Sequence, residues 1–273
     1  MQSQKLIIFS DLDGTLLDHH SYSWEPARPA LEKLSELCIP LILCTSKTAA
    51  EVSKIHIEMV LETPFIVENG AAIVFPQTKR EESQTAHFFG RSYQNLLKIV
   101  DTIRSQACFQ FTGFSDMSPQ TVAKITGLPL DRAELAKQRL CSEPLLWDDD
   151  QEALDNFRNE LDKQNLKLLQ GGRFYHVLDK GAGKGNALNW LLNRLSEESP
   201  GSNYFSVALG DGPNDMDMLE AADLAVIIPS ANGHILGPKN SKTLHATEPG
   251  PAGWNRIILH LLEFYFKQGA DHG

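Results

Sequence analysis

The sequence predicts an α/β protein, in which a Rossmann-like core around a parallel sheet is interrupted by an inserted α+β segment. Short continuous apolar runs alternate with helical patterns in the first and last thirds of the chain. That alternation is typical of strands joined by parallel crossovers. The middle of the chain carries strand and helix patterns of its own, which indicates a second folding unit. Acidic or hydroxyl residues directly follow several of the apolar runs.

The composition is that of a globular protein large enough for one large domain or two unequal domains. The chain has 273 residues, of which 42% are hydrophobic and 22% charged. Its formal net charge of -10 opposes general binding to nucleic acid or to anionic membranes. The apolar runs are too short for a signal peptide or a membrane span, so we expect a cytoplasmic protein. The four cysteines lack metal-ligand spacing, and we expect buried, reduced thiols.

The beginning of the chain predicts the first part of the core. Residues 6–9 form a continuous apolar run, which favours a parallel strand buried on both faces. A helical pattern over 27–37 and an apolar run over 41–44 complete a strand–helix–strand unit. A helix over 48–61 follows. Asn69-Gly70 lies between two apolar runs and predicts a tight hairpin.

The insert is expected over residues 83–178, so that residues 1–82 and 179–273 together form the core. Its predicted helices cover 92–106, 118–127, 131–139 and 151–164, and its predicted strands cover 108–114, 143–147, 166–170 and 174–178. After the insert, the parallel pattern of strand, helix and strand returns.

Acidic residues follow strands from both ends of the chain. Asp11 and Asp13 follow the first strand, and Asp211, Asn214 and Asp215 follow a strand of the returning half. Because parallel strands end at one edge of a sheet, we expect these groups to meet. Asp11, the backbone carbonyl of Asp13 and Asp211 predict an oxygen site that suits Mg²⁺. Each motif taken alone is also compatible with a turn or a helix cap.

Four motifs in order along the chain, DLDGT, LILCT, GKGNA and GDGPND, resemble those of the haloacid dehalogenase superfamily of phosphatases. The resemblance spans nearly the whole chain. It implies that Asp11 is the nucleophile and that Asp13 is the general acid and base. The metal ligands that we expect are Asp11, Asp13, Asp211 and Asp215.

The same resemblance assigns a hydroxyl and an ammonium group. Thr45 matches the hydroxyl that holds the phosphoryl group. Lys184 matches the ammonium that neutralises the nucleophile and the phosphate. Lys180 is the alternative, because Gly183 stands where relatives carry an acidic residue. We favour Lys184, which fits Gly-x-x-Lys-Gly ahead of a helix.

The insert resembles the larger α/β cap of sugar-phosphate phosphatases in this superfamily, where the cap supplies specificity. The insert also contains the segments FSDMSPQTVAKITGLPLDRAELAKQR, SEPLLW and GGRFYHVLD, and the core contains CTSKTAAE and VENGAA. Together these segments carry a narrower resemblance, to the phosphatases of mannosyl-3-phosphoglycerate. The substrate-binding candidates are Ser46, Lys47, Glu68, Asn69, Arg139, Arg173, His176 and Asn214. Structural alternatives remain for several of them. Glu68 and Asn69 are also compatible with a role in the hairpin turn, and Arg139 with a surface ion pair. Arg173 is also compatible with stacking on a neighbouring aromatic ring, and His176 with a hydrogen-bonded position on an edge strand.

Three functions are compatible with these motifs. The first is a Mg²⁺-dependent phosphomonoester hydrolase that acts through an aspartyl-phosphate on mannosyl-3-phosphoglycerate or, more broadly, on sugar phosphates. The second is a phosphotransferase or mutase with the same nucleophile. The third is a non-catalytic phosphosugar-binding protein, against which the acid Asp13 beside a nucleophile argues. A cation-pump ATPase is excluded, since such pumps span a membrane and lack a carboxyl at the position of Asp13. The choice between mannosyl and glucosyl, and the oligomeric state, stay open.

Overall fold

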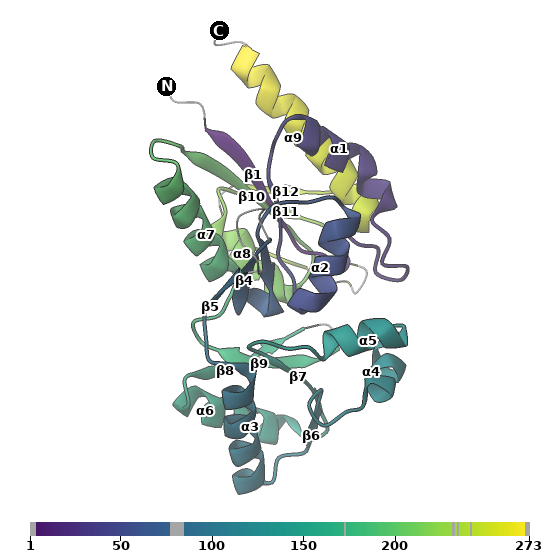
Figure 1. Ribbon diagram of the computed structural model, residues 1–273, viewed down its shortest axis with the longest axis vertical. Coiled ribbons are helices and arrows are strands. Elements are labelled where there is room, and N and C mark those ends of the chain that lie inside the picture. The colour runs from purple at the N-terminus through teal and green to yellow at the C-terminus, as the bar shows by residue number, and fades with distance from the viewer. Residues whose placement is uncertain are drawn as a thin grey trace. The chain divides into compact units, whose positions relative to one another are not determined.

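The computed structural model describes residues 4–76, 85–171, 173–230, 233, 235–240 and 242–270, with side chains up to residue 265. The chain divides into two units, Met1–Cys44 with Leu188–Gly273 and Thr45–Ala187, and Figure 1 shows their elements. The core boundary expected at residue 82 lies outside the described residues. The division into a core of 1–82 and 179–273 and a cap of 83–178 therefore stays a prediction.

The first unit is built around a five-stranded sheet, in which all neighbouring strands are parallel. Its order is β12-β11-β10-β1-β2. The strands are β1 (Lys5–Ser10), β2 (Leu41–Leu43), β10 (Tyr204–Gly210), β11 (Leu224–Ile227) and β12 (Thr243–His245). Ile7, Ile8 and Phe9 of β1 are at most 1% exposed, as expected for a strand covered on both faces. The predicted α/β fold with a parallel core sheet is confirmed.

The C-terminal helix of the first unit supports the end of β1. The helices of this unit are η1 (Glu25–Ala27), α1 (Arg28–Glu36), η3 (Pro213–Asp215), α8 (Met216–Ala221) and α9 (Gly250–Ala270). A further helix, α7 (Lys184–Glu198), begins in the second unit and ends in the first. Figure 1 shows α1 beside α9, and the Ala30 N–H donates to Asn255 Oδ1 at 2.9 Å. Trp254 of α9 is fully buried, and its indole N–H donates to Ser10 Oγ at 3.0 Å. A hydrogen bond from α9 thus fixes Ser10, the last residue of β1, which directly precedes Asp11.

The second unit contains two antiparallel sheets, of order β3-β4-β5 and β6-β7-β9-β8. The strands are β3 (Phe65–Val67), β4 (Ala72–Phe75), β5 (Thr85–Phe88), β6 (Phe111–Gly113), β7 (Glu143–Trp147), β8 (Leu166–Gln170) and β9 (Tyr175–Asp179). The helices are α2 (Ala49–Glu58), η2 (Glu68–Gly70), α3 (Tyr93–Ala107), α4 (Pro119–Thr126), α5 (Leu130–Ala136) and α6 (Gln151–Lys163). The hairpin predicted at Asn69-Gly70 is confirmed, since it joins β3 to β4.

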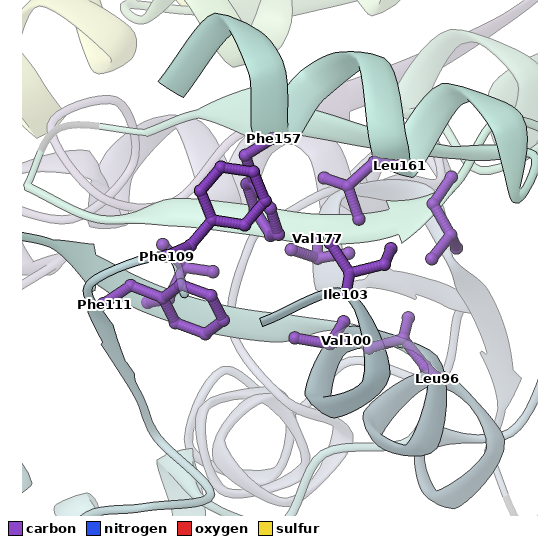
Figure 2. Packing of buried hydrophobic residues seen from close by; sticks show 10 residues of the cluster. Leu96, Val100, Ile103, Phe109, Phe111, Phe157, Leu161 and Val177 are labelled. Atoms are coloured by element: carbon purple, nitrogen blue, oxygen red, sulfur yellow. The ribbon is translucent and has the colours of Figure 1, made fainter. Parts of the chain in front are cut away.

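One face of the four-stranded sheet packs against α3 and α6. Figure 2 shows this apolar cluster, which includes Leu96, Val100 and Ile103 of α3, Phe157 and Leu161 of α6, and Val177 of β9. Tyr175 packs against the same cluster. Because side chains alternate along a strand, His176 projects from the opposite face, away from α3 and α6.

Two of the four cysteines contradict the expected burial. All four are free thiols, but only Cys44 and Cys141 are buried, whereas Cys38 and Cys108 are exposed. Both exposed cysteines follow a helix and have left-handed φ angles, 53° and 55°. The chain leaves the helix at such a residue, so its side chain no longer follows the apolar face.

Within the described part of the chain, none of the helices combines the length and the apolar character that crossing a membrane requires.

Candidate active site

Three aspartates lie together in the first unit. Asp11 follows β1, Asp211 follows β10, and Asp215 ends η3. All three are buried, and each offers a carboxylate oxygen within 4.8 Å of those of the others. The register of the sheet explains this proximity, since Ser10 pairs with Leu209 and the strands are parallel. The structure thus brings together acidic groups that lie about 200 positions apart in the sequence, as the parallel pattern predicts.

Backbone and hydroxyl donors hold the two later aspartates. Asp215 Oδ2 accepts the backbone N–H of Asp211 at 3.1 Å and that of Gly212 at 2.9 Å. The Thr15 hydroxyl donates to Asp211 Oδ1 at 3.0 Å. Such donors hold the carboxylate oxygens at defined positions.

Two glycines leave the space that these carboxylates occupy. A Cβ on Gly14 would lie 2.6 Å from Asp211 Oδ2, and one on Gly210 would lie 2.5 Å from Asp215 Cβ. Gly14 also has a φ of 84°, which residues with a Cβ rarely adopt. Gly14, the glycine of DLDGT, therefore allows the backbone turn and also leaves space for the Asp211 carboxylate.

The acidic group fits a divalent cation. Three buried carboxylates at this separation repel one another, and a cation removes that repulsion. Mg²⁺ takes oxygen ligands and usually retains several waters, so a few carboxylates suffice. The Asp13 side chain is not part of the three-carboxylate group. The backbone of Asp13 forms an isolated β-bridge with Leu17 in a tight turn. The expected role of Asp13 as a metal ligand stays a prediction.

In the second unit, the segment Thr45–Lys47 is held through its carbonyl groups; we call it the Thr45 loop. The Thr45 carbonyl accepts the Asn69 N–H, and the Lys47 carbonyl accepts the Glu68 N–H, both at 2.9 Å. The Ser46 carbonyl accepts the two terminal nitrogens of Arg139 at 3.3 Å each. Every carbonyl of the Thr45 loop thus has a partner.

Glu68 is fully buried and is surrounded by donors from residues 139–142. Its Oε1 accepts the Leu140 N–H at 2.6 Å. Its Oε2 accepts the Cys141 N–H at 3.0 Å and the Ser142 hydroxyl at 2.7 Å. Arg139 Nε lies 3.6 Å from the same oxygen. The carboxylate and guanidinium that the sequence offers as substrate ligands are therefore engaged with protein groups.

The candidate lysines differ in their environment. Lys184 begins α7 and is 1% exposed, whereas Lys180 is exposed and forms an ion pair with Asp162. The Gly183 N–H, one residue before Lys184, donates to the Gly70 carbonyl at 3.3 Å. The lysine that fits the motif is thus the buried one of the two.

His176 is buried, and its Nδ1 has no hydrogen-bond partner among the described residues. Burial lowers the pKa of its imidazole to about 3, with further contributions from the charges of Arg139 and Lys184. The ring is therefore neutral at physiological pH and can both donate and accept a hydrogen bond. Arg173, by contrast, is exposed in the turn between β8 and β9.

The remaining candidates lie in different settings: Lys47 and Asn214 are half-buried, and Asn69 is buried. Sequence reasoning missed Thr15, although the DLDGT motif contains it, and Ser142. No local pattern marks Ser142, because its bond to Glu68 joins residues 74 positions apart.

Known proteins resemble the chain over nearly its whole length. The model of the haloacid dehalogenase-like hydrolases matches residues 8–248. A glucosyl-3-phosphoglycerate/mannosyl-3-phosphoglycerate phosphatase from Persephonella marina is 38% identical over 265 residues, which cover 94% of this chain and 97% of the relative.

Solved structures share the fold. A haloalkanoate superfamily phosphatase from Bacteroides thetaiotaomicron matches with a TM-score of 0.68 at 19% identity, over 94% of this chain and 95% of that one. The sucrose-phosphatase of Synechocystis, solved with sucrose and phosphate, matches with a TM-score of 0.63 at 16% identity, over 94% and 98% of the two chains. The family model and the relative from Persephonella marina confirm the resemblance to the haloacid dehalogenase superfamily, and the chain belongs to the haloacid dehalogenase-like hydrolases.

Proposed function

We propose that this protein is a Mg²⁺-dependent phosphatase that hydrolyses mannosyl-3-phosphoglycerate to mannosylglycerate through an aspartyl-phosphate. The observation that carries the proposed chemistry is the buried group of Asp11, Asp211 and Asp215 after two parallel strands, in a chain of this hydrolase family. The proposed substrate is supported by the relative from Persephonella marina, whose name includes it.

Two carboxyl groups carry out the proposed reaction. An oxygen of Asp11 attacks phosphorus, the ester P–O bond breaks, and Asp13 gives its proton to the departing alkoxide. Asp13 then accepts a proton from the water that attacks the aspartyl-phosphate. This second step releases inorganic phosphate and restores both carboxyl groups.

Charge neutralisation is assigned to a bound ion and to two side chains. Asp11, Asp211 and Asp215 would hold Mg²⁺, as would the Asp13 carbonyl, and the bound ion would supply positive charge to the phosphoryl oxygens. We assign to Thr45 a hydrogen bond to a phosphoryl oxygen, and to Lys184 the neutralisation of charge on the phosphate.

The rest of the substrate carries one carboxylate and a set of sugar hydroxyls. We assign the carboxylate to Arg173, whose exposed guanidinium offers a planar fork of donors, with Lys47 as a second cation. The neutral imidazole of His176 suits a hydroxyl group, and Ser46, Asn69 and Asn214 are further proposed partners.

Phosphate release from a panel of substrates in the presence of Mg²⁺ tests the proposal. We expect mannosyl-3-phosphoglycerate to be hydrolysed best, its glucosyl analogue next, and mannose 1-phosphate and mannose 6-phosphate poorly. Equal kcat/KM for mannosyl-3-phosphoglycerate and mannose 6-phosphate would contradict the assignment and leave a broad sugar-phosphate phosphatase. Transfer of the phosphoryl group to a second sugar hydroxyl, with little free phosphate, would instead indicate a mutase.

A further inference from the structure

We propose that Glu68 and Arg139 are a positioning pair, which holds the Thr45 loop in the conformation that binds the phosphoryl group. The inference rests on the proposed function in assigning phosphate to Thr45. In this proposal Glu68 and Arg139 support the Thr45 loop and do not contact the substrate themselves.

The first argument is the way in which the Thr45 loop is attached. Backbone N–H groups of the hairpin turn bind the carbonyls of Thr45 and Lys47. The carbonyl between them, that of Ser46, is bound by the Arg139 guanidinium. The Ser46 carbonyl is therefore held by a side chain, that of Arg139, and not by a backbone group. A substitution at residue 139 removes this attachment.

The second argument is that Arg139 depends on Glu68. The side chain of Arg139 is 3% exposed and that of Glu68 is 0% exposed, so each charge is buried and needs a compensating partner. Ser142 also binds both residues, since its hydroxyl donates to Glu68 and accepts from Arg139 Nη2 at 2.6 Å. The carboxylate, the guanidinium and the hydroxyl act as one network.

The third argument is the backbone of Glu68 itself. Its φ angle is 52°, in the left-handed region that is uncommon for residues other than glycine, asparagine and aspartate. Such a conformation persists when surrounding contacts impose it. Here the donors from residues 140–142 hold the carboxylate, while the Glu68 N–H binds the Lys47 carbonyl. Glu68 thus supports the Thr45 loop through its backbone and, by way of Arg139, through its side chain.

The two possible roles of the pair, positioning the loop and binding the substrate, predict different effects of substitutions on different substrates. If Arg139 positions the Thr45 loop, its loss weakens the handling of every phosphomonoester and of phosphate itself. If Arg139 contacts the glycerate carboxylate, its loss affects only substrates that carry this group. p-Nitrophenyl phosphate, which lacks both sugar and carboxylate, separates the two cases.

The variants are Glu68→Gln, Arg139→Lys, Arg139→Gln and the double variant Glu68→Gln/Arg139→Gln. Glu143→Gln is the matched control. Glu143 is a buried carboxylate of the same unit that also receives a backbone N–H, but its described hydrogen bonds come from Tyr93 and Ser115. The kinetic measurements are kcat/KM for mannosyl-3-phosphoglycerate and for p-nitrophenyl phosphate, with the inhibition constant of inorganic phosphate.

We expect Glu68→Gln and Arg139→Gln to lower kcat/KM for both substrates by similar factors, about tenfold to hundredfold, and to weaken inhibition by phosphate. Because the pair acts as a unit, the double variant should lose little more than the worse single variant. Arg139→Lys should retain part of the activity, and Glu143→Gln should stay within about twofold of the wild type. A loss confined to mannosyl-3-phosphoglycerate, or additive losses in the double variant, would overturn the proposal.

Hydrogen–deuterium exchange provides a readout that needs no activity. Exchange in a peptide that covers residues 45–48 should be faster in folded Glu68→Gln and Arg139→Lys than in the wild type and Glu143→Gln. Unchanged exchange in both variants would refute the positioning role. If the wild type hydrolyses neither substrate, the proposed function fails, and this exchange experiment still decides whether the pair holds the loop.

Discussion

The backbones of Gly70 and Gly183 approach so closely that a Cβ on Gly70 would lie 2.1 Å from the Gly183 carbonyl carbon. Gly70 belongs to the turn that binds the Thr45 loop, and Gly183 precedes Lys184. The contact thus brings two of the four motif regions together within the second unit. It depends on the absence of a side chain at residue 70.

Gly70→Ala should therefore be far more harmful than Gly127→Ala. Both glycines have left-handed φ angles, 82° and 81°, but a Cβ on Gly127 has no atom within 4 Å. The conformational cost, roughly 1–2 kcal/mol, is shared by both variants. Overpacking adds roughly 1–3 kcal/mol in Gly70→Ala alone. Thermal unfolding measures the difference, and equal shifts of Tm in the two variants would contradict the proposed steric conflict.

Asp11→Asn should abolish turnover without unfolding the protein. An amide is a poor nucleophile and cannot form the aspartyl-phosphate. It also removes one charge from the buried acidic group, so Tm measured in excess chelator should not fall. Asp217→Asn, at an exposed position of α8, is the control. Turnover by Asp11→Asn above a few per cent of the wild-type rate would require a different nucleophile.

Removal of divalent metal should stop activity, and Mg²⁺ should restore it. Ca²⁺ should inhibit, because it accepts more oxygen ligands at longer distances and would engage both carboxylate oxygens of Asp11, which leaves neither to attack phosphorus. Independently of activity, Mg²⁺ should raise Tm of the wild type, since it binds the folded acidic group, and should raise it less in Asp211→Asn. Full activity in excess chelator would refute the metal site.

Arg173→Ala should change specificity more than chemistry. Losing a charge-assisted bond to the glycerate carboxylate costs roughly 1.5–3 kcal/mol in kcat/KM for mannosyl-3-phosphoglycerate and its glucosyl analogue. The low activity toward mannose 6-phosphate, which has no carboxylate, should remain nearly the same. Parallel losses for all three substrates would remove Arg173 from the carboxylate site.

His176 should make stability fall at acid pH. Its pKa is lowered from 6.5 to about 3 in the folded protein, so the stability that it contributes is present above pH 6.5 and is lost as the pH falls toward 3. Relative to His176→Gln, the free energy of unfolding of the wild type should decrease by about 1.4 kcal/mol per pH unit below about pH 6. Denaturant unfolding at several pH values measures this, and a difference that does not vary with pH would contradict a buried neutral imidazole.

The sequence by itself determined the strands and the acidic group. Continuous apolar runs mark β1 and β10 because both faces of a parallel sheet are buried, and this requirement is local to each strand. Asp11 and Asp211 could be placed together because parallel strands end at one sheet edge, whatever lies between them in the chain. The hairpin at Asn69-Gly70 follows from turn chemistry within a few residues.

Only the tertiary structure decided the partners of Glu68 and Arg139 and the exposure of Cys38 and Cys108. Residue 68 lies in a turn and residues 139–142 follow a short helix, and no periodicity relates the two segments. Their contact depends on how the chain packs after α5. The sequence alone therefore also allows Arg139 a surface ion pair, which its burial in the structure excludes. A buried charge finds its partner through three-dimensional packing, because the free energy of desolvation depends on every neighbour and not on the adjacent sequence.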